Sequence, residues 1–191
     1  IRLQCPVKRI ARGKEGVEVS SSHGKTSKFD NVILATHSDQ ALNILEKPSS
    51  AEIEILGSIH YQNNEAVLHW DDSLLPKRKL AWAGWNYHKT LNPINGTSVT
   101  YNMNILQGIK SEETFCVSLN MTDRIDPAKI IKKFNYGHPV FSKNSIKSQK
   151  RLGEINGVNR TYFCGAYWGS GFHEDGVNSA LNVCSYFGKD L

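Results

Sequence analysis

The N-terminal part of the chain has the hydrophobic pattern of β-strands. Short alternating or apolar runs at 1–10, 16–20 and 29–36 are separated by turn residues at Gly13 and Gly24, which predicts two or three strands. The run Val32–Ala35 is continuously apolar, as expected of a strand that is buried on both faces. The chain therefore opens on a small β-structure that ends in a core strand.

The pattern then changes to a helical period. Ser38-Asp39 can cap a helix that Pro48 ends. Ser49 and Glu52 have the spacing of a capping box, in which each side chain bonds the backbone N–H of the other residue. This spacing predicts a second helix over Ala51–Ile59, so two helices follow the first strands.

Strand signals return after the second helix. We expect strands at 59–62, 66–70, 80–87, 98–103 and 114–119, with turns at 63–64, 71–72 and 92–96. These strands would form an antiparallel sheet. Asp126-Pro127 then predicts a helix with Ile130, Ile131 and Phe134 buried, because proline is favourable in the first helical turn. A basic helix over 144–155 leads to the last strand.

The C-terminal stretch joins a strand, a glycine-rich loop and a helix. Tyr162–Tyr167 predicts a buried strand, and a helix follows the acidic pair Glu174-Asp175. The loop glycines are Gly165, Gly169 and Gly171, and the apolar stripe of the helix is Val177, Ala180, Leu181, Cys184 and Phe187. This geometry lets backbone approach a ligand and aims free N–H groups at it. An ordinary strand-to-helix connection has the same pattern, so both interpretations stay open.

A family resemblance favours the ligand interpretation. Phe-Cys-Gly-Ala-Tyr at 163–167 with Gly-Phe-His-Glu-Asp-Gly at 171–176 resembles the C-terminal signature of the flavin-containing amine oxidase superfamily. This variant is similar to a bacterial branch of predicted NAD/FAD-binding proteins, which is related to a domain fused to some plant cyclopropane fatty acid synthases. The resemblance implies an FAD-dependent oxidoreductase with a mixed α/β fold. Its flavin would accept a hydride from the substrate.

The resemblance also implies which residues contact FAD. The main chain of Val7 would hold the adenine, and Ala35 and Thr36 would lie close to the cofactor. In the C-terminal signature the implied contacts are Gly165, Ala166, Tyr167, Gly171, Phe172, His173, Glu174 and Asp175. Backbone N–H groups of this turn would stabilise negative charge on the reduced flavin, and His173 could add a proton or a positive charge. The alternative for the two carboxylates is a favourable interaction with the helix dipole, about 0.3–1 kcal/mol.

Catalytic residues are less well defined by the sequence. By resemblance, the substrate cavity would be lined from the antiparallel sheet, by Trp85, Tyr87, Tyr101 and Asn102. Trp85, Tyr87 and His173 are the catalytic candidates, and His138 could reach the cavity. Aromatic residues of sheets also commonly belong to the core, which is the alternative for these residues.

Two departures from the family pattern concern the chemistry. Many amine oxidases carry a lysine that contacts flavin N5 through water, but residues 64–69 contain no lysine. Tyr167 stands where many members place a glutamate on the ribityl chain. These departures count against amine oxidation and not against flavin binding. A small-molecule or lipid-like substrate is expected.

The dinucleotide fingerprint Gly-x-Gly-x-x-Gly does not occur in these 191 residues. In the family it lies at the N-terminus of the whole protein, so we expect this chain to be a C-terminal fragment partnered by the missing N-terminal part. Residues 1–38 and 156–191 would complete an FAD-binding lobe, and 39–155 would form a substrate-binding lobe. The strands at 32–35 and 162–165 should then lie together. Alone, the fragment is expected to be inactive, to bind FAD weakly or not at all, and to self-associate through exposed strand faces.

Composition narrows the remaining function classes. The 39% hydrophobic and 21% charged content is typical of a soluble globular protein, and no apolar run is long enough to span a membrane. The four cysteines lack Cys-x-x-Cys spacing, which predicts reduced thiols of a cytoplasmic protein without a metal site. The net charge of +5 lies in short clusters and does not indicate nucleic-acid binding. A non-catalytic binding or scaffold domain with the same fold is the alternative function.

Overall fold

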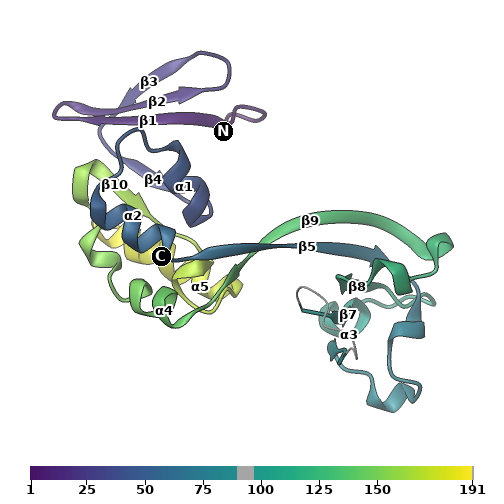
Figure 1. Cartoon of the computed structure of the whole chain (residues 1–191). Coiled ribbons are helices and arrows are strands. Elements are labelled where there is room, and N and C mark those ends of the chain that lie inside the picture. Colours follow the sequence, from purple (N-terminus) through teal and green to yellow (C-terminus); the bar gives the residue numbers. More distant parts are fainter. Residues whose placement is uncertain (90–96, 191) are drawn as a thin grey trace. The chain divides into compact units, whose positions relative to one another are not determined.

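The computed structural model describes residues 1–89 and 97–190, and the chain divides into two compact units. The first unit contains Ile1–Tyr61 and Pro139–Leu191, and the second contains Gln62–His138 (Figure 1). These boundaries differ from the predicted ones because both helices between 38 and 57 pack on the core of the first unit. Within the described residues, no helix is long and apolar enough to cross a membrane.

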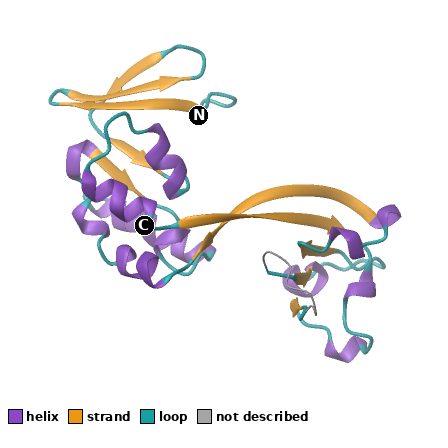
Figure 2. Ribbon diagram, viewed as in Figure 1, coloured by secondary structure: helices purple, strands orange, loops and turns teal. Residues whose placement is uncertain are grey.

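The described residues of the first unit form two small sheets and four α-helices, together with short 3-10 turns. Figure 2 shows how strands and helices alternate in this unit. The strands are β1 (Val7–Gly13), β2 (Gly16–Ser21), β3 (Thr26–Phe29), β4 (Val32–Leu34) and β10 (Thr161–Phe163). The helices are α1 (Ser38–Ile44), α2 (Ser50–Gly57), α4 (Lys143–Gln149) and α5 (His173–Ser185). β1, β2 and β3 form an antiparallel sheet, and β4 pairs with β10 in a second sheet. The first unit by itself therefore has the predicted mixed α/β character.

One core joins these elements. Its fully buried residues are Ile10, Val17, Leu34, Ala41, Leu45, Ile55, Leu56, Ile155 and Phe163. The capping box of α2 is confirmed, since Ser49 Oγ accepts the Glu52 N–H at 3.2 Å and Glu52 Oε2 accepts the Ser49 N–H at 2.6 Å. The side chain of Glu52 also forms an ion pair with Arg12 on β1. Local capping and a buried charge pair thus fix α2 against the first sheet.

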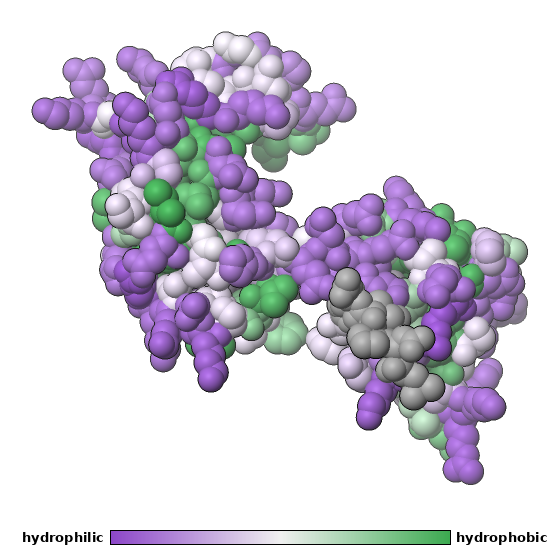
Figure 3. Space-filling view, viewed as in Figure 1, coloured by the Kyte–Doolittle hydropathy of each residue, from purple (hydrophilic) through white to green (hydrophobic). Residues whose placement is uncertain are grey.

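The pairing of the two distant strands is confirmed. β4 and β10 run parallel, with Ile33 opposite Tyr162, although about 130 residues separate them in sequence. The expectation that Val32–Ala35 is buried on both faces is wrong, because Ile33 is 48% exposed. In the described residues β4 has one hydrogen-bonded neighbour, so one of its edges stays unpaired. The exposed side chain of Ile33 shows that one of its faces is uncovered as well. Figure 3 shows apolar surface beside the three-stranded sheet of this unit.

The C-terminal helix is turned relative to the predicted stripe. α5 begins at His173 instead of after Asp175, and its buried residues are Ser179 and Val183. Val177 and Phe187, which the pattern placed inside, are 45% and 41% exposed. The reason is a polar contact, because Ser179 Oγ accepts the N–H of Gly165 at 2.8 Å and fixes which face of α5 meets β10.

The second unit is built on an antiparallel sheet, as predicted. Its strands are β5 (His60–His69), β6 (Trp85–Tyr87), β7 (Val99–Asn102), β8 (Cys116–Leu119) and β9 (Ile130–Val140), in the order β6-β7-β8-β5-β9. The short helix α3 (Met103–Gln107) follows β7. Val67, Leu74, Met121 and Ile125 form one apolar cluster and Ala66, Val99 and Leu119 another. β5 and β9 both continue past the boundary of this unit.

Several predicted elements of this region are wrong. The helix expected after Asp126-Pro127 is a single 3-10 turn, capped by Asp126 Oδ1 on the Ala128 N–H at 2.9 Å, and the chain then continues as β9. β-branched Ile130 and Ile131 favour a strand, and pairing with β5 decides it. The expected turn at 63–64 is also wrong, since β5 runs through it without a break.

Other boundaries shift by less. The strand expected at 80–87 is reduced to β6, because Lys79–Ala81 forms a 3-10 turn. The basic helix expected at 144–155 ends as α4 at Gln149, and a separate 3-10 turn follows. The turn predicted at 92–96 lies outside the described residues.

Candidate functional site

The carboxyl ends of β4 and β10 lie at one edge of their sheet. The N–H of Cys164, the residue after β10, donates to the carbonyl of Leu34 at 3.0 Å, so pairing continues one residue past the end of β10. Ala35-Thr36 and Gly165-Ala166 follow directly, and Ala35 and Thr36 are exposed. The structure therefore brings together four of the predicted cofactor residues. In open α/β sheets, ligands bind outside the carboxyl ends of parallel strands.

Gly165 makes the turn at this edge possible. Its φ is +156°, and a Cβ at this position would lie 2.5 Å from Cε1 and 2.8 Å from Cδ1 of Tyr167. Its N–H donates to Ser179 Oγ on α5. No larger residue fits without displacing the tyrosine ring, so the glycine sets how closely β10, the loop and α5 approach one another.

Tyr167 lies in the interior rather than at the edge. Its side chain is 4% exposed, and burial raises its pKa far above the usual range. Gln149 on α4 donates through Nε2 to the carbonyls of Tyr167 at 2.8 Å and Gly169 at 2.7 Å. The Tyr167 ring is therefore a packing element of the loop. A ligand at this edge would meet the neighbouring main chain instead of the tyrosine hydroxyl.

Asp175 organises the glycine-rich loop. Its Oδ2 accepts the N–H groups of Ser170 at 3.0 Å and Phe172 at 2.9 Å. The carboxylate lies so close to Gly169 that a Cβ there would be 2.2 Å from Oδ1. A carboxylate in the first turn also interacts favourably with the helix dipole. Asp175 thus holds the loop in the shape that leads into α5.

The beginning of α5 is open to solvent. Gly171 has a φ of +93°, Phe172 is 56% exposed, and His173 and Glu174 are exposed as well. The first N–H groups of an α-helix have no acceptor within the helix, and α5 is thirteen residues long. This turn can therefore donate hydrogen bonds to an anionic group or a carbonyl, as flavin binding would require.

Val7 belongs to the other sheet of the same unit. It is the first residue of β1, is 37% exposed and lies opposite Ser21. The preceding carbonyl, that of Pro6, accepts the N–H of Ser22 at 3.0 Å. The backbone of this segment is thus ordered by the β1–β2 pairing while the Val7 side chain stays accessible.

The aromatic candidates of the second unit lie on one face of the β6–β7 pair. Trp85 and Tyr87 are exposed there, and Tyr101 is partly buried against the cluster of Ala66, Val99 and Leu119. Trp85 and Tyr87 alternate with buried Asn86 on β6 and are 55% and 74% exposed. Tyr101 on β7 meets Trp85 edge to face, with ring centroids 5.4 Å apart. Asn102, in contrast, is 1% exposed and caps α3 through Oδ1. We call Trp85, Tyr87 and Tyr101 the aromatic face.

His138, the remaining candidate, is part of a polar contact inside the second unit. Its Nδ1 lies 2.9 Å from Nδ2 of Asn64 on β5. The Oδ1 of Asn64 in turn accepts from Nδ2 of Asn120 at 2.7 Å. The contact joins β5 to β9 and gives this histidine a structural role.

Sequence reasoning missed two residues at the edge of β4. The rings of His37 and Tyr61 stack, with centroids 4.5 Å apart and an interplanar angle of 14°. Tyr61 Oη accepts the N–H of Ser38 at 3.0 Å, and burial raises the pKa of this tyrosine. The sequence could have indicated His37, because it directly follows the predicted cofactor residue Thr36. It could not have indicated Tyr61, whose contact with His37 depends on the fold.

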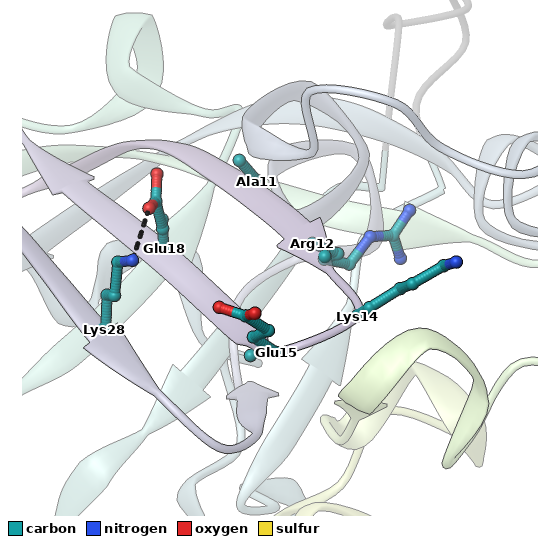
Figure 4. Close-up of a pocket in the computed structure, with 8 residues that line it drawn as sticks. Ala11, Arg12, Lys14, Glu15, Glu18 and Lys28 are labelled. Atoms are coloured by element: carbon teal, nitrogen blue, oxygen red, sulfur yellow. Dashed lines mark ion pairs between the residues drawn. The ribbon is translucent and has the colours of Figure 1, made fainter.

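A separate cavity lies along the β1–β2 hairpin. It has a volume of about 490 Å³ and is lined by Ala11, Arg12, Gly13, Lys14, Glu15, Gly16, Glu18 and Lys28 (Figure 4). Lys28 Nζ and Glu18 Oε1 form an ion pair of 3.5 Å across it. None of the predicted site residues lines this cavity. Its residues can therefore serve as a control region when ligand binding at the candidate site is measured.

Solved structures similar to this chain include a fatty acid isomerase and two oxidases. A CLA-producing fatty acid isomerase from P. acnes has a TM-score of 0.67 and 13% identity, covering 96% of this chain and 47% of its own. A putative protoporphyrinogen oxidase from Exiguobacterium sp. 255-15 has the same TM-score and 14% identity, covering 98% and 47%. Wild-type putrescine oxidase bound to putrescine has a TM-score of 0.60 and 9% identity, covering 97% and 49%. The chain spans about half the length of these structures.

Sequence comparison identifies the family. No curated protein matches this sequence. Residues 1–107 match the family model described as flavin containing amine oxidoreductase. This match covers more than half of the chain, and the mixed α/β fold agrees with it. The chain therefore belongs to the flavin-containing amine oxidoreductase family.

Proposed function

We propose that the protein is an FAD-dependent oxidoreductase whose flavin lies against the carboxyl ends of β4 and β10. The observation that carries the proposal is the meeting of three features at one edge of the first unit. These are two parallel strand ends, a backbone bend that only glycine permits, and an exposed helix N-terminus. Together they offer close main-chain approach and oriented N–H donors, which flavin sites require.

The residues of this edge would have distinct roles. FAD, when bound, supplies an acceptor for two electrons and a proton in the form of a hydride. The N–H groups at the start of α5 would stabilise negative charge, and His173 would hold a proton next to them. Ala35 and Thr36 would lie along the cofactor, and the backbone near Val7 would hold the adenine. Asp175 and Gly165 act indirectly, by keeping the loop in shape.

For the substrate we propose an apolar or lipid-like small molecule that contacts the aromatic face. Trp85 and Tyr87 present large exposed rings, which favour apolar or planar partners. The strand residues 64–69 carry no lysine, which counts against amine oxidation. One similar structure is a fatty acid isomerase. A non-catalytic binding domain with the same fold is the second candidate, favoured by the absence of a lysine there.

Substitution of Gly176 tests the flavin site. A methyl group at Gly176 would lie 3.9 Å from Ala166, so the chain has room for it, and alanine in a helix is more stable than glycine by about 0.5–1 kcal/mol. In the protein expressed from its full reading frame, Gly176→Ala should therefore keep or raise stability. If flavin packs on this backbone, Gly176→Ala and Gly176→Val should progressively lower the flavin content, measured by absorbance of the purified protein.

The control is Gly153→Ala, because nothing lies within 4 Å of a Cβ at Gly153. It should purify with the flavin content of the wild type. Full flavin occupancy in a folded Gly176→Val variant would contradict the proposed site. A full-length wild type that never contains flavin would favour the binding-domain alternative.

A further inference from the structure

A chain of polar side chains crosses the buried face of the sheet in the second unit. Nε2 of His69 on β5 lies 2.9 Å from Oγ of Ser118 on β8, and this Oγ lies 2.7 Å from Oγ1 of Thr100 on β7. Oγ1 of Thr100 lies 3.0 Å from Nε2 of His88, which directly follows β6. We call these four residues the polar chain. His69, Ser118 and Thr100 are each fully buried.

The backbone fixes which atoms of the polar chain donate. The N–H of Asp71 donates to Nδ1 of His69 at 3.1 Å, so this nitrogen carries no proton. A neutral His69 then carries its proton on Nε2 and donates to Ser118. Ser118 and Thr100 each have a single O–H proton, so Ser118 donates to Thr100 and Thr100 donates to His88. Every donor has an acceptor only when Nε2 of His88 is unprotonated.

Protonation of His88 disturbs this order. With a proton on Nε2, both ends of the polar chain donate inward, and one O–H proton of Ser118 or Thr100 is left without an acceptor in the chain. A buried hydroxyl proton that loses its partner destabilises the folded arrangement. We propose that the polar chain is a pH-sensitive switch that holds β6 on the sheet only while His88 is neutral.

The strand that the switch would release is small and carries Trp85 and Tyr87, two of the three residues of the aromatic face. β6 has three residues, is at one end of the strand order and pairs with β7 alone among the described strands. The His88 N–H donates to the Ser98 carbonyl at 2.9 Å, and the Asn102 N–H donates to the Gly84 carbonyl at 3.0 Å. Loosening His88 therefore acts directly on the pairing that positions Trp85 and Tyr87. The switch does not require that the aromatic face bind a substrate.

Burial and one neighbouring charge shift the pKa of His88 in the same direction. Burial lowers the pKa of His88, and the positive charge of Arg124 lowers it further. At the other end burial lowers the pKa of His69, whereas the carboxylate of Asp71 raises it. Asp71 itself stays ionised: burial would raise its pKa, but hydrogen bonds from Asp126 and Ser73 and the charge of Lys129 lower it to about 2.

One more titratable group lies on the buried face, the thiol of Cys116. Burial and the carboxylates of Asp72 and Asp71 raise its pKa to about 12. Cys116 therefore stays neutral wherever histidines titrate.

His88 is the half-exposed end of the polar chain, at which a proton arrives. Because the pKa of His88 is depressed in the folded state, the stability that neutral His88 provides is present above its unfolded pKa. This stability is lost as the pH falls through the lower, folded value.

The first test reads the protonation states in the 191-residue chain. Nitrogen-15 NMR of the imidazoles near neutral pH should show the proton of His88 on Nδ1 and that of His69 on Nε2. In Thr100→Val, whose valine has nearly the same shape without the hydroxyl, His88 no longer has to accept. Its titration midpoint should rise by about one pH unit, a roughly tenfold change in protonation. A neutral His88 protonated on Nε2, or an unchanged midpoint, would overturn the proposal.

The second test reads the strand. Hydrogen exchange of the peptide spanning β6, corrected for the intrinsic effect of pH, should accelerate at least about tenfold between about pH 7.5 and pH 5. His88→Asn should remove this pH dependence, whereas His60→Asn, at an exposed histidine of the first unit, should leave it unchanged. Equal protection of β6 at both pH values in the wild type would overturn the switch.

Discussion

Replacing Gly165 by alanine is expected to destabilise the first unit by about 2–6 kcal/mol. A methyl group there would lie 2.5 Å from the ring of Tyr167. The backbone φ of Gly165 is +156°, a value that residues with a side chain rarely adopt. Overpacking costs about 1–3 kcal/mol and such a backbone conformation about 1–3 kcal/mol more. Because Tyr167 is held from the other side by its buried surroundings, it cannot move aside without opening the core.

Hydrogen exchange measured over β10 and α5 at increasing urea gives this free energy for the first unit. A global unfolding midpoint would not, because the chain has two units. The loss should appear in β10 and α5 together, since Gly165 donates to Ser179 on α5. Protection of these peptides equal to that of the wild type would show that Tyr167 yields freely and that Gly165 is not required.

Replacing Arg12 by methionine is expected to have the second large effect, a loss of about 3–5 kcal/mol. The side chains of Arg12 and Glu52 are 6% and 1% exposed. Arg12 also donates to the carbonyl of Lys47 at 2.7 Å. Methionine fills the space of the arginine stem but leaves the carboxylate of Glu52 buried without its partner. Removal of one member of a buried pair is costly for this reason.

The pH dependence distinguishes this mechanism from lost packing. Burial alone would raise the pKa of Glu52, but hydrogen bonds from Arg12 and Ser49 and the charge of Arg12 hold it below the usual value. In the wild type, this contribution is present above the unfolded pKa of Glu52 and is lost as the pH falls through the folded value. In Arg12→Met burial dominates, so the deficit should be largest near neutral pH and shrink as Glu52 becomes protonated.

The matched control is the double variant Arg12→Met with Glu52→Gln. Glutamine keeps the capping box of α2 and removes the charge, so the double variant should recover much of the stability lost in the single one. Exchange of the peptides over α2 measures both. A double variant that is less stable than Arg12→Met would show that the ion pair is not the source of the effect.

Sequence reasoning succeeded where the signal is local or where a family pattern carries it. The capping box of α2 depends on two residues three positions apart, and it is present with both hydrogen bonds. The pairing of β4 with β10 is a long-range contact that no local pattern encodes, and the family resemblance supplied it. At the candidate site the same resemblance selected Gly165 and Ala35, which the fold brings to one edge.

The errors arise where tertiary contacts outweigh local preference. Asp126-Pro127 is a good helix start, but the helix ends after one turn because Ile130–Val140 pairs with β5. Burial of the Tyr167 ring against Gly165 likewise depends on the fold, and the place of this residue in the motif did not predict it. The polar chain gave no sequence signal, since its four residues come from distant segments and meet only across the sheet.

An FAD titration of the nitrogen-15-labelled chain tests whether flavin binds at the edge formed by β4, β10 and α5, as we propose. These 191 residues contain no Gly-x-Gly-x-x-Gly, so binding should be weaker than about 10 μM, each lost 1.4 kcal/mol costing tenfold. Amide shifts should change at Ala35-Thr36 and over 165–175 and stay constant along the cavity at 11–18. Shifts confined to that cavity would overturn the proposed flavin site, and submicromolar binding would overturn the expected weak affinity of this chain.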